Sequence, residues 1–263
     1  MSERRVSDWV DERQSQGRYS FTWSQVQTGL DLGRGALEAA LRRLKESGRL
    51  VSPYQQFYVI VPLEYRRTGA PPPSWYVDDL MGAMRRSYYV GLLSAASLHG
   101  SAHQRPQEFQ VVTDRSVRAR TVGRARLRFF VRGNLGEAAV ERRKTETGYM
   151  RVSTAEQTAL DLLRYVYACG HLDNVAAVLD GLAPELDAAR LVEVAPNTET
   201  ADVQRLGYLL DELGHADRVE PLRRWLEERG SSRVPLRRGG ARDASLLDHS
   251  WRVYVNSDVT TAR

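Results

Sequence analysis

The residues with the clearest chemical use lie on one amphipathic stretch near the N-terminus. Apolar side chains recur at helical spacing from residue 34 to residue 47, which predicts a helix with one buried face. Small residues and arginines occupy the opposite face. Small residues let a helix backbone enter the major groove of DNA, and arginines reach phosphates or guanine edges. The predicted DNA-contacting residues of this helix are Arg34, Gly35, Glu38, Ala39, Arg42 and Arg43.

The helix that precedes this one carries a complete start signal. Thr22 is followed three residues later by Gln25, so each side chain can bond the backbone amide of the other residue. Phe21 and Val26 occupy the positions of a hydrophobic staple. We therefore expect a short helix that begins after Thr22 and ends near Gly29. We also count Thr22 among the DNA-contacting residues.

The first sixty residues predict a winged helix-turn-helix. A first amphipathic helix is expected over residues 4–14, and the two helices above follow it. Residues 49–51 and 57–60 read as strands joined by a loop at 52–56. The wing tip, which would touch the DNA backbone or the minor groove, comprises Tyr54, Gln55 and Gln56. A winged helix that binds protein is the alternative, because residues 1–60 hold nine basic against seven acidic side chains.

No other pattern indicates catalysis. His99 and His103 are four residues apart, but Gly100 stands where a zinc protease has glutamate, so a helix-end hydrogen bond is the better interpretation. Ser94 lacks the glycine-containing elbow of a serine nucleophile. The turn 238–241 reads as flexible. We predict no catalytic residue, no metal and no cofactor.

The charge is unevenly distributed along the 263 residues, which carry a net charge of +5. Residues 61–153 hold sixteen basic against eight acidic side chains, and residues 154–263 hold thirteen against eighteen. The basic middle predicts an anionic partner, or packing against the acidic end. A single cysteine, Cys169, excludes an internal disulfide and is typical of a reducing compartment. With no leader or long apolar span visible, the sequence predicts a cytoplasmic protein.

The centre of the chain predicts a buried helix. No charged residue occurs from Tyr88 to Leu98, and Gly100 would end the helix. Strands are expected after it and a series of helices beyond residue 154. The predicted fold class is α+β: an N-terminal winged helix-turn-helix followed by a larger mixed α/β domain rich in helices. The predicted domains are residues 1–62, a linker and connecting helix at 63–86, and residues 87–263.

Three separated segments resemble one family. The most specific is the string YYVGLLSAASLHGSAHQRP followed by FQVVT, which resembles the AbiEi-type antitoxins of type IV toxin–antitoxin systems. The winged-helix segment, including residues 32–37 and 44–50, is similar to the N-terminal domain of that family. Residues 152–162, supported by 205–210, form the third match.

The resemblance implies a two-domain antitoxin that is not an enzyme. Its winged helix would bind inverted repeats of operator DNA as a transcriptional autorepressor, as a homodimer on DNA. Its C-terminal domain would counteract a nucleotidyltransferase-type toxin, directly or indirectly, in a system of phage abortive infection. The alternative is a stand-alone winged-helix transcriptional regulator with a partner- or ligand-sensing C-terminal domain. No membrane partner is expected.

Overall fold

The structure, a computed structural model, describes residues 5–101 and 106–257 and has the predicted α+β class. Two compact units make up the chain. Unit 1 comprises residues 1–89, 107–135 and 142–151, and unit 2 comprises 90–106, 136–141 and 152–263. Neither unit is continuous in sequence, because the chain passes from one to the other several times. The predicted domain bounds stay a prediction, since units defined by packing do not establish independent folding.

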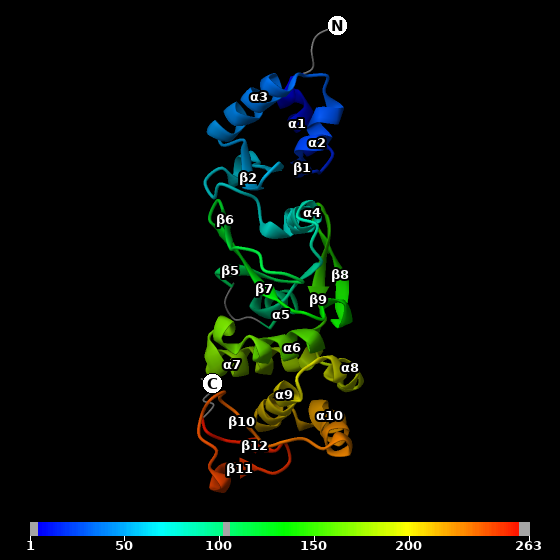
Figure 1. Ribbon diagram of the computed structural model, residues 1–263, viewed down its shortest axis with the longest axis vertical. Coiled ribbons are helices and arrows are strands. Elements are labelled where there is room, and N and C mark those ends of the chain that lie inside the picture. The colour runs from blue at the N-terminus through cyan, green and yellow to red at the C-terminus, as the bar shows by residue number, and fades with distance from the viewer. Residues whose placement is uncertain (1–4, 102–105, 258–263) are drawn as a thin grey trace. The chain divides into compact units, whose positions relative to one another are not determined.

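The first sixty residues of unit 1 have the predicted order of three helices and a hairpin (Figure 1). Their core gathers apolar side chains from every helix, including Trp9, Val26, Leu37 and Leu41. The strands form an antiparallel sheet in the order β1-β3-β2. The elements are α1 (Val6–Ser15), β1 (Ser20–Thr22), α2 (Trp23–Gly29), α3 (Arg34–Glu46), β2 (Leu50–Tyr54) and β3 (Phe57–Ile60).

Two local predictions in this segment need correction. The sequence pattern does not predict strand β1, because its last residue, Thr22, is the N-cap of α2 and indicates only a helix start. The predicted loop 52–56 is also too long. Strand β2 continues to Tyr54 through a bulge, and Pro53 is buried in it, so only Gln55 and Gln56 form the turn. A bulge accommodates proline in a strand because it leaves one amide outside the ladder.

The segment predicted as a linker and connecting helix, residues 63–86, is part of unit 1. It contains the single turns η1 (Leu63–Tyr65) and η2 (Pro73–Trp75) and the predicted connecting helix α4 (Val77–Ala83). Between them, the Thr68 carbonyl oxygen accepts a hydrogen bond from the Arg124 amide at 2.7 Å. Gly123, at φ +59°, has no room for a side chain, because a Cβ there would lie 2.2 Å from the same oxygen. This glycine permits the close approach of the two backbones.

A six-stranded mixed sheet follows, in the order β6-β7-β5-β4-β9-β8. Strand β5 pairs parallel with β7 along its whole length, and β6 pairs antiparallel with β7. Strands β4, β8 and β9 continue from one unit into the other. The strand bounds are β4 (Tyr88–Val90), β5 (Glu108–Thr113), β6 (Arg120–Val122), β7 (Ala125–Val131), β8 (Val140–Thr145) and β9 (Gly148–Ser153).

The predicted buried helix from Tyr88 to Leu98 is wrong in its first three residues. These form strand β4, Gly91 is the N-cap, and α5 covers only Leu92–Leu98. All three strand residues are buried. A buried strand and a buried helix both appear as runs without charge, so the pattern does not distinguish them. Gly100 ends α5 at φ +85°, as predicted.

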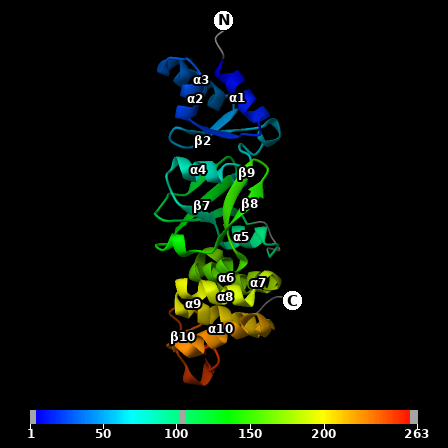
Figure 2. The same cartoon turned by 90° about the vertical axis from the view of Figure 1, so that its right-hand side faces the viewer.

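Helices pack together in unit 2 (Figure 2). Helix α6 begins after Thr154, whose hydroxyl accepts from the Gln157 amide at 3.3 Å. It packs on α5, α7, α8 and α9, and α10 packs on α8 and α9. The bounds are α6 (Ala155–Arg164), η4 (Val166–Cys169), α7 (His171–Leu182), α8 (Ala188–Val194), α9 (Thr200–Glu212) and α10 (Ala216–Arg229).

The C-terminal segment of unit 2 wraps back onto α9. Its strands β10 (Val234–Pro235), β11 (Leu247–Asp248) and β12 (Val253–Tyr254) form a small sheet in the order β10-β12-β11. Trp251 lies flat against α9, where a Cβ on Gly207 would come within 2.0 Å of its ring. The Trp251 indole also donates to Asp211 at 2.9 Å. Because Gly207 has no side chain, the Trp251 ring can pack directly against the backbone of α9.

Candidate nucleic-acid interface

Helix α3 presents the predicted polar face to solvent. Leu37 and Leu41 are buried on its inner side, whereas Ala40 and Leu44 are partly buried against the same core. On the outer side Ala39 is half-buried. The remaining residues predicted to contact DNA from this helix are exposed: Arg34, Gly35, Glu38, Arg42 and Arg43. The structure thus brings these six residues to one accessible surface.

Two of the three arginines on this surface form ion pairs within the helix. Arg34 contacts Glu38 at 3.0 Å, and Arg42 contacts Glu46 at 3.8 Å. All four side chains are more than half exposed, and exposed pairs of this kind contribute only about 0.3–0.5 kcal/mol. Either arginine can therefore exchange its glutamate for a phosphate at small cost. Arg43 has no ion-pair partner within the described part of the chain.

The N-terminal end of α3 is also open. Its N-cap is Gly33, and no side chain in the described residues caps it. A Cβ on Gly35 would meet nothing within 4 Å. Free amides at a helix start attract anions because they carry the positive end of the helix dipole. Glu38 lies one turn further along the helix. Burial raises the pKa of Tyr58, and the charge of the Glu38 carboxylate raises it as well.

The wing is short and fixed to α2. Gln56 adopts φ +57°, a left-handed conformation, in the tight turn between β2 and β3. Its carbonyl oxygen accepts the backbone amide of Trp23 at 2.8 Å. Gln55 and Gln56 are exposed, whereas Tyr54 is half-buried. Of the predicted wing residues, the two glutamines are therefore better placed to reach a ligand than Tyr54.

Thr22 performs the predicted capping role. Its hydroxyl accepts from the Gln25 amide at 3.4 Å, and the Gln25 side chain accepts from the Thr22 amide at 2.8 Å. The same hydroxyl lies 2.9 Å from that of Ser24. The capping box is confirmed. A DNA contact by Thr22 stays a prediction, and it would have to share an oxygen already used in folding.

The basic middle of the sequence is partly neutralised in the sheet of unit 1. Glu108 on β5 contacts both Arg126 at 3.2 Å and Arg128 at 3.3 Å on the paired strand β7. On β8 and β9, Arg142 lies over the Tyr149 ring at 4.6 Å. The Tyr149 side chain is 51% exposed. Arginine beside an exposed aromatic ring suits nucleic acid as well as protein, so this surface does not identify its partner.

The remaining candidates have structural roles. His99 caps the end of α5, and its Nε2 donates to the Ser153 carbonyl oxygen at 2.8 Å. His103 lies outside the described residues. Ser94 and Cys169 are buried. Within residues 5–101 and 106–257, no group of three His, Cys, Asp or Glu side chains is arranged to hold a metal ion.

One cluster was missed by sequence reasoning. Arg238, expected in a flexible turn, contacts both carboxylate oxygens of Asp202 at 2.7 and 2.8 Å. Asp202 is completely buried on α9 and also accepts from Arg205 at 2.8 Å. Asp202 and Arg205 are three residues apart on one helix, and this spacing could have predicted their ion pair. No local sequence pattern indicated the contact between Asp202 and Arg238, which are thirty-six residues apart.

Comparison with known proteins confirms the predicted resemblance. Residues 89–212 match the family model of the AbiEi antitoxin C-terminal domain. The crystal structure of the RV2827C protein from Mycobacterium tuberculosis is similar, with a TM-score of 0.68 at 15% sequence identity. That alignment covers 96% of this chain and 92% of that chain, and it shows a shared fold.

A more distant similarity was found to an antigenic nucleotidyltransferase-like protein from Paracoccidioides brasiliensis. It covers 57% of this chain and 89% of that chain at 11% identity, and its TM-score of 0.36 is too low to support an argument. No curated protein sequence matches the chain. The family match supports an antitoxin of a toxin–antitoxin system, and hence a toxin partner. In the described residues, no helix is long and apolar enough to cross a membrane.

Proposed function

We propose that the chain is an antitoxin that represses its own operon by binding operator DNA and that counteracts a nucleotidyltransferase-type toxin. The observation that carries the DNA-binding half is the exposed face of α3, with arginines along it and an uncapped start. The antitoxin half rests on the AbiEi match over residues 89–212. A stand-alone regulator is the competing function, because it would use the same helix without a toxin.

In this proposal α3 enters the major groove. Gly35 and Ala39 let the backbone approach the base edges, and Arg42 and Arg43 contact phosphates or guanine. A phosphate at the start of α3 would be held by free amides and by Arg34. The exposed glutamines of the wing would contact the DNA backbone or the minor groove. Inverted repeats would be occupied by two copies of the chain, one on each half-site.

Binding to DNA from the region upstream of the operon tests the proposed DNA binding by α3. The double substitution Arg42→Ala/Arg43→Ala should abolish a gel shift, and the salt dependence of log K should weaken by roughly 0.9 for each phosphate that the variant no longer neutralises. A charge-matched control is Arg190→Ala/Arg233→Ala, which removes two exposed arginines from unit 2. If both double variants bind equally, α3 is not the DNA-binding helix.

A second variant separates binding from folding. Gly35→Leu adds bulk where a Cβ meets nothing, so stability should be retained while the helix can no longer enter the groove. Gly82→Leu is the matched control, since it also enters open space on an exposed helix position of α4. Operator binding by the Gly35→Leu protein at parental affinity would contradict the proposed docking.

Rescue of growth tests the proposal that the chain counteracts a toxin. The chain, expressed from an unrelated promoter, should protect cells that produce the nucleotidyltransferase-type toxin encoded next to it. The Arg42→Ala/Arg43→Ala variant should protect equally well, because the foreign promoter removes any need for repression. DNA binding without any protection would favour the stand-alone regulator instead.

A further inference from the structure

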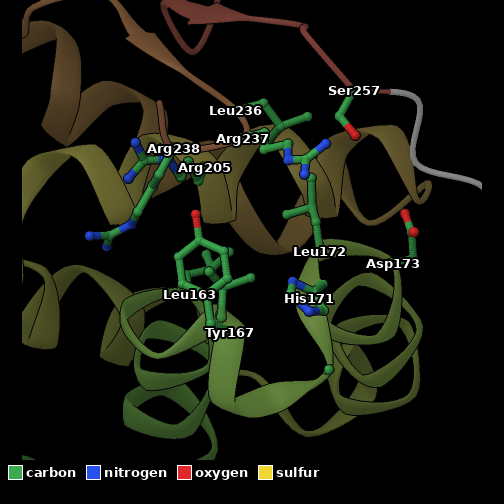
Figure 3. A pocket seen from close by; sticks show the side chains of 12 residues that line it. Leu163, Tyr167, His171, Leu172, Asp173, Arg205, Leu236, Arg237, Arg238 and Ser257 are labelled. Carbon is green, nitrogen blue, oxygen red and sulfur yellow. The ribbon is translucent and has the colours of Figure 1, made fainter. Parts of the chain in front are cut away.

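A cavity of about 400 Å³ opens in unit 2, where η4 and the start of α7 face the C-terminal segment (Figure 3). Its size lies within the usual range for small-molecule sites, roughly 300–1,000 Å³. Apolar side chains line it on both sides, among them Leu163, Leu172 and Leu236. Arginines line the side contributed by α9 and the C-terminal segment. Such an apolar lining with a few polar groups is typical of a ligand site.

The cationic side is built around one shared carboxylate. Arg205 and Arg238 both pair with Asp202, so one buried negative charge faces two positive charges. Arg205 is further held by the Pro235 carbonyl oxygen at 3.1 Å. The Nε atom of Arg238 is buried and has no hydrogen-bond partner within the described residues. Asp202 alone therefore does not neutralise the two guanidiniums, and the charge of Glu199 also acts on Arg205.

Arg237 adds a third guanidinium on a fixed backbone. Its amide donates to the Asn256 side chain at 2.8 Å, and the Asn256 amide group donates back to its carbonyl oxygen at 3.2 Å. The Arg237 side chain is exposed and lacks an ion-pair partner in the part of the chain that the structure describes. In Figure 3 it extends into the cavity opposite His171. Backbone anchoring thus presents an uncompensated charge to the cavity.

Aromatic rings form the facing wall. Tyr167 is 61% exposed, and its ring meets that of His171 edge-on at 5.6 Å. Its hydroxyl points toward the side that holds Arg205 and Arg238 (Figure 3). No described side chain caps the start of α7, which adjoins the same wall, and Asp173 is the one acid there.

From this arrangement we propose that the cavity binds a mononucleotide, with its phosphate at Arg237 and its base against Tyr167. Guanidinium groups and helix-start amides are the donors that phosphate prefers. A large, exposed aromatic face is of no use to a bare anion, but it stacks on any nucleobase. Asp173 would accept hydrogen bonds from ribose hydroxyls. This site is separate in sequence from α3 and goes beyond the proposed function.

Titration calorimetry on the full chain tests the proposal with the four common ribonucleoside monophosphates, adenosine and inorganic phosphate as probes. At least one monophosphate should bind more tightly than adenosine or phosphate alone. Arg237→Ala and Tyr167→Ala should each weaken it roughly tenfold, since a charged hydrogen bond or a stacked base contributes about that factor. The matched control Arg233→Ala, at an exposed position, should bind like the parent.

Three results would overturn the proposal. One is the absence of binding by all four monophosphates at millimolar concentration. Another is phosphate alone binding as tightly as they do, which would leave the aromatic wall without a role. The third is equal weakening by Arg237→Ala and Arg233→Ala, the sign of unspecific attraction. Operator binding by the Arg237→Ala protein should be unchanged, so this test fails or succeeds independently of the DNA-binding proposal.

Discussion

The backbone amide of Trp23 donates to the carbonyl oxygen of Gln56 at 2.8 Å, which fixes the first turn of α2 to the tip of the β2–β3 hairpin. This backbone hydrogen bond joins the wing to helix α2. The wing cannot move without disturbing the first turn of α2. A pre-arranged surface of this kind loses less conformational entropy when it binds a ligand.

The conformation of Gln56 gives a first prediction. A non-glycine residue at φ +57° is strained by roughly 1–2 kcal/mol, and glycine is not. Since glycine also loses more backbone entropy on folding, Gln56→Gly should raise the free energy of unfolding by up to about 1 kcal/mol. Gln55→Gly, next to it at an ordinary φ, should lower that free energy by about 0.5–1 kcal/mol. Urea unfolding of both variants measures the difference, and equal effects would contradict the strain.

The capping box gives a second. Thr22→Ala removes the acceptor for the Gln25 amide and should lower the free energy of unfolding by about 1 kcal/mol. Thr22→Ser keeps an acceptor oxygen and should stay within a few tenths of the parent. Thr28→Ala removes an exposed hydroxyl elsewhere on the same helix and serves as the control. A Thr22→Ser protein as unstable as Thr22→Ala would mean that the methyl group, and not the cap, matters.

Two glycine-to-alanine substitutions should have opposite signs. In Gly207→Ala the new methyl group would lie 2.0 Å from the Trp251 ring, so overpacking should cost about 1–3 kcal/mol. In Gly82→Ala the methyl group meets nothing, and the better helix propensity of alanine should add up to about 1 kcal/mol. Melting temperatures should therefore fall for the first variant and rise for the second. A rise in both would place Trp251 away from α9.

Alkaline pH should weaken unit 1. Burial raises the pKa of Tyr88, as does the hydrogen bond of its hydroxyl to Asp78 at 2.8 Å, and burial also raises the pKa of Tyr76. Each phenol therefore keeps its proton in the folded state at a pH where the unfolded chain has lost it. The contribution to stability is complete below pH about 10 and is lost as the pH rises further.

The slope should approach about 1.4 kcal/mol per pH unit for each tyrosine. Tyr88→Phe should flatten the fall in the free energy of unfolding between pH 10 and 11, measured by urea titration. A Tyr88→Phe protein with the parental slope would show that this hydroxyl does not titrate differently on unfolding.

The sequence predicted those elements whose signals are local. The capping residues marked the start of α2, and the apolar spacing defined α3. Strand β4 was misread as helix because burial removes charge from either structure. Its neighbours β5 and β9 lie far along the chain, so no local pattern could show that it fills a place in a sheet.

The face of α3 and the cavity in unit 2 also differ in how far local sequence patterns predict them. The exposed face of α3 follows from helical periodicity, so its residues were predictable one by one. The cavity in unit 2 depends on Asp202 meeting Arg238, and on the exposure of Tyr167 beyond the end of α6. A carboxylate within a helix is usually solvated, and nothing near Asp202 in the sequence indicates that it is completely buried.

The position of β4 bears on the synthesis of the protein. Strand β4 lies between β5 and β9 in the sheet, and β9 is completed only at residue 153. A nascent or prematurely terminated chain that lacks β9 leaves one edge of β4 without a neighbour. Unpaired edges recruit other strands and lead to aggregation. Chains that end before residue 153 are therefore expected to aggregate more readily than the full chain.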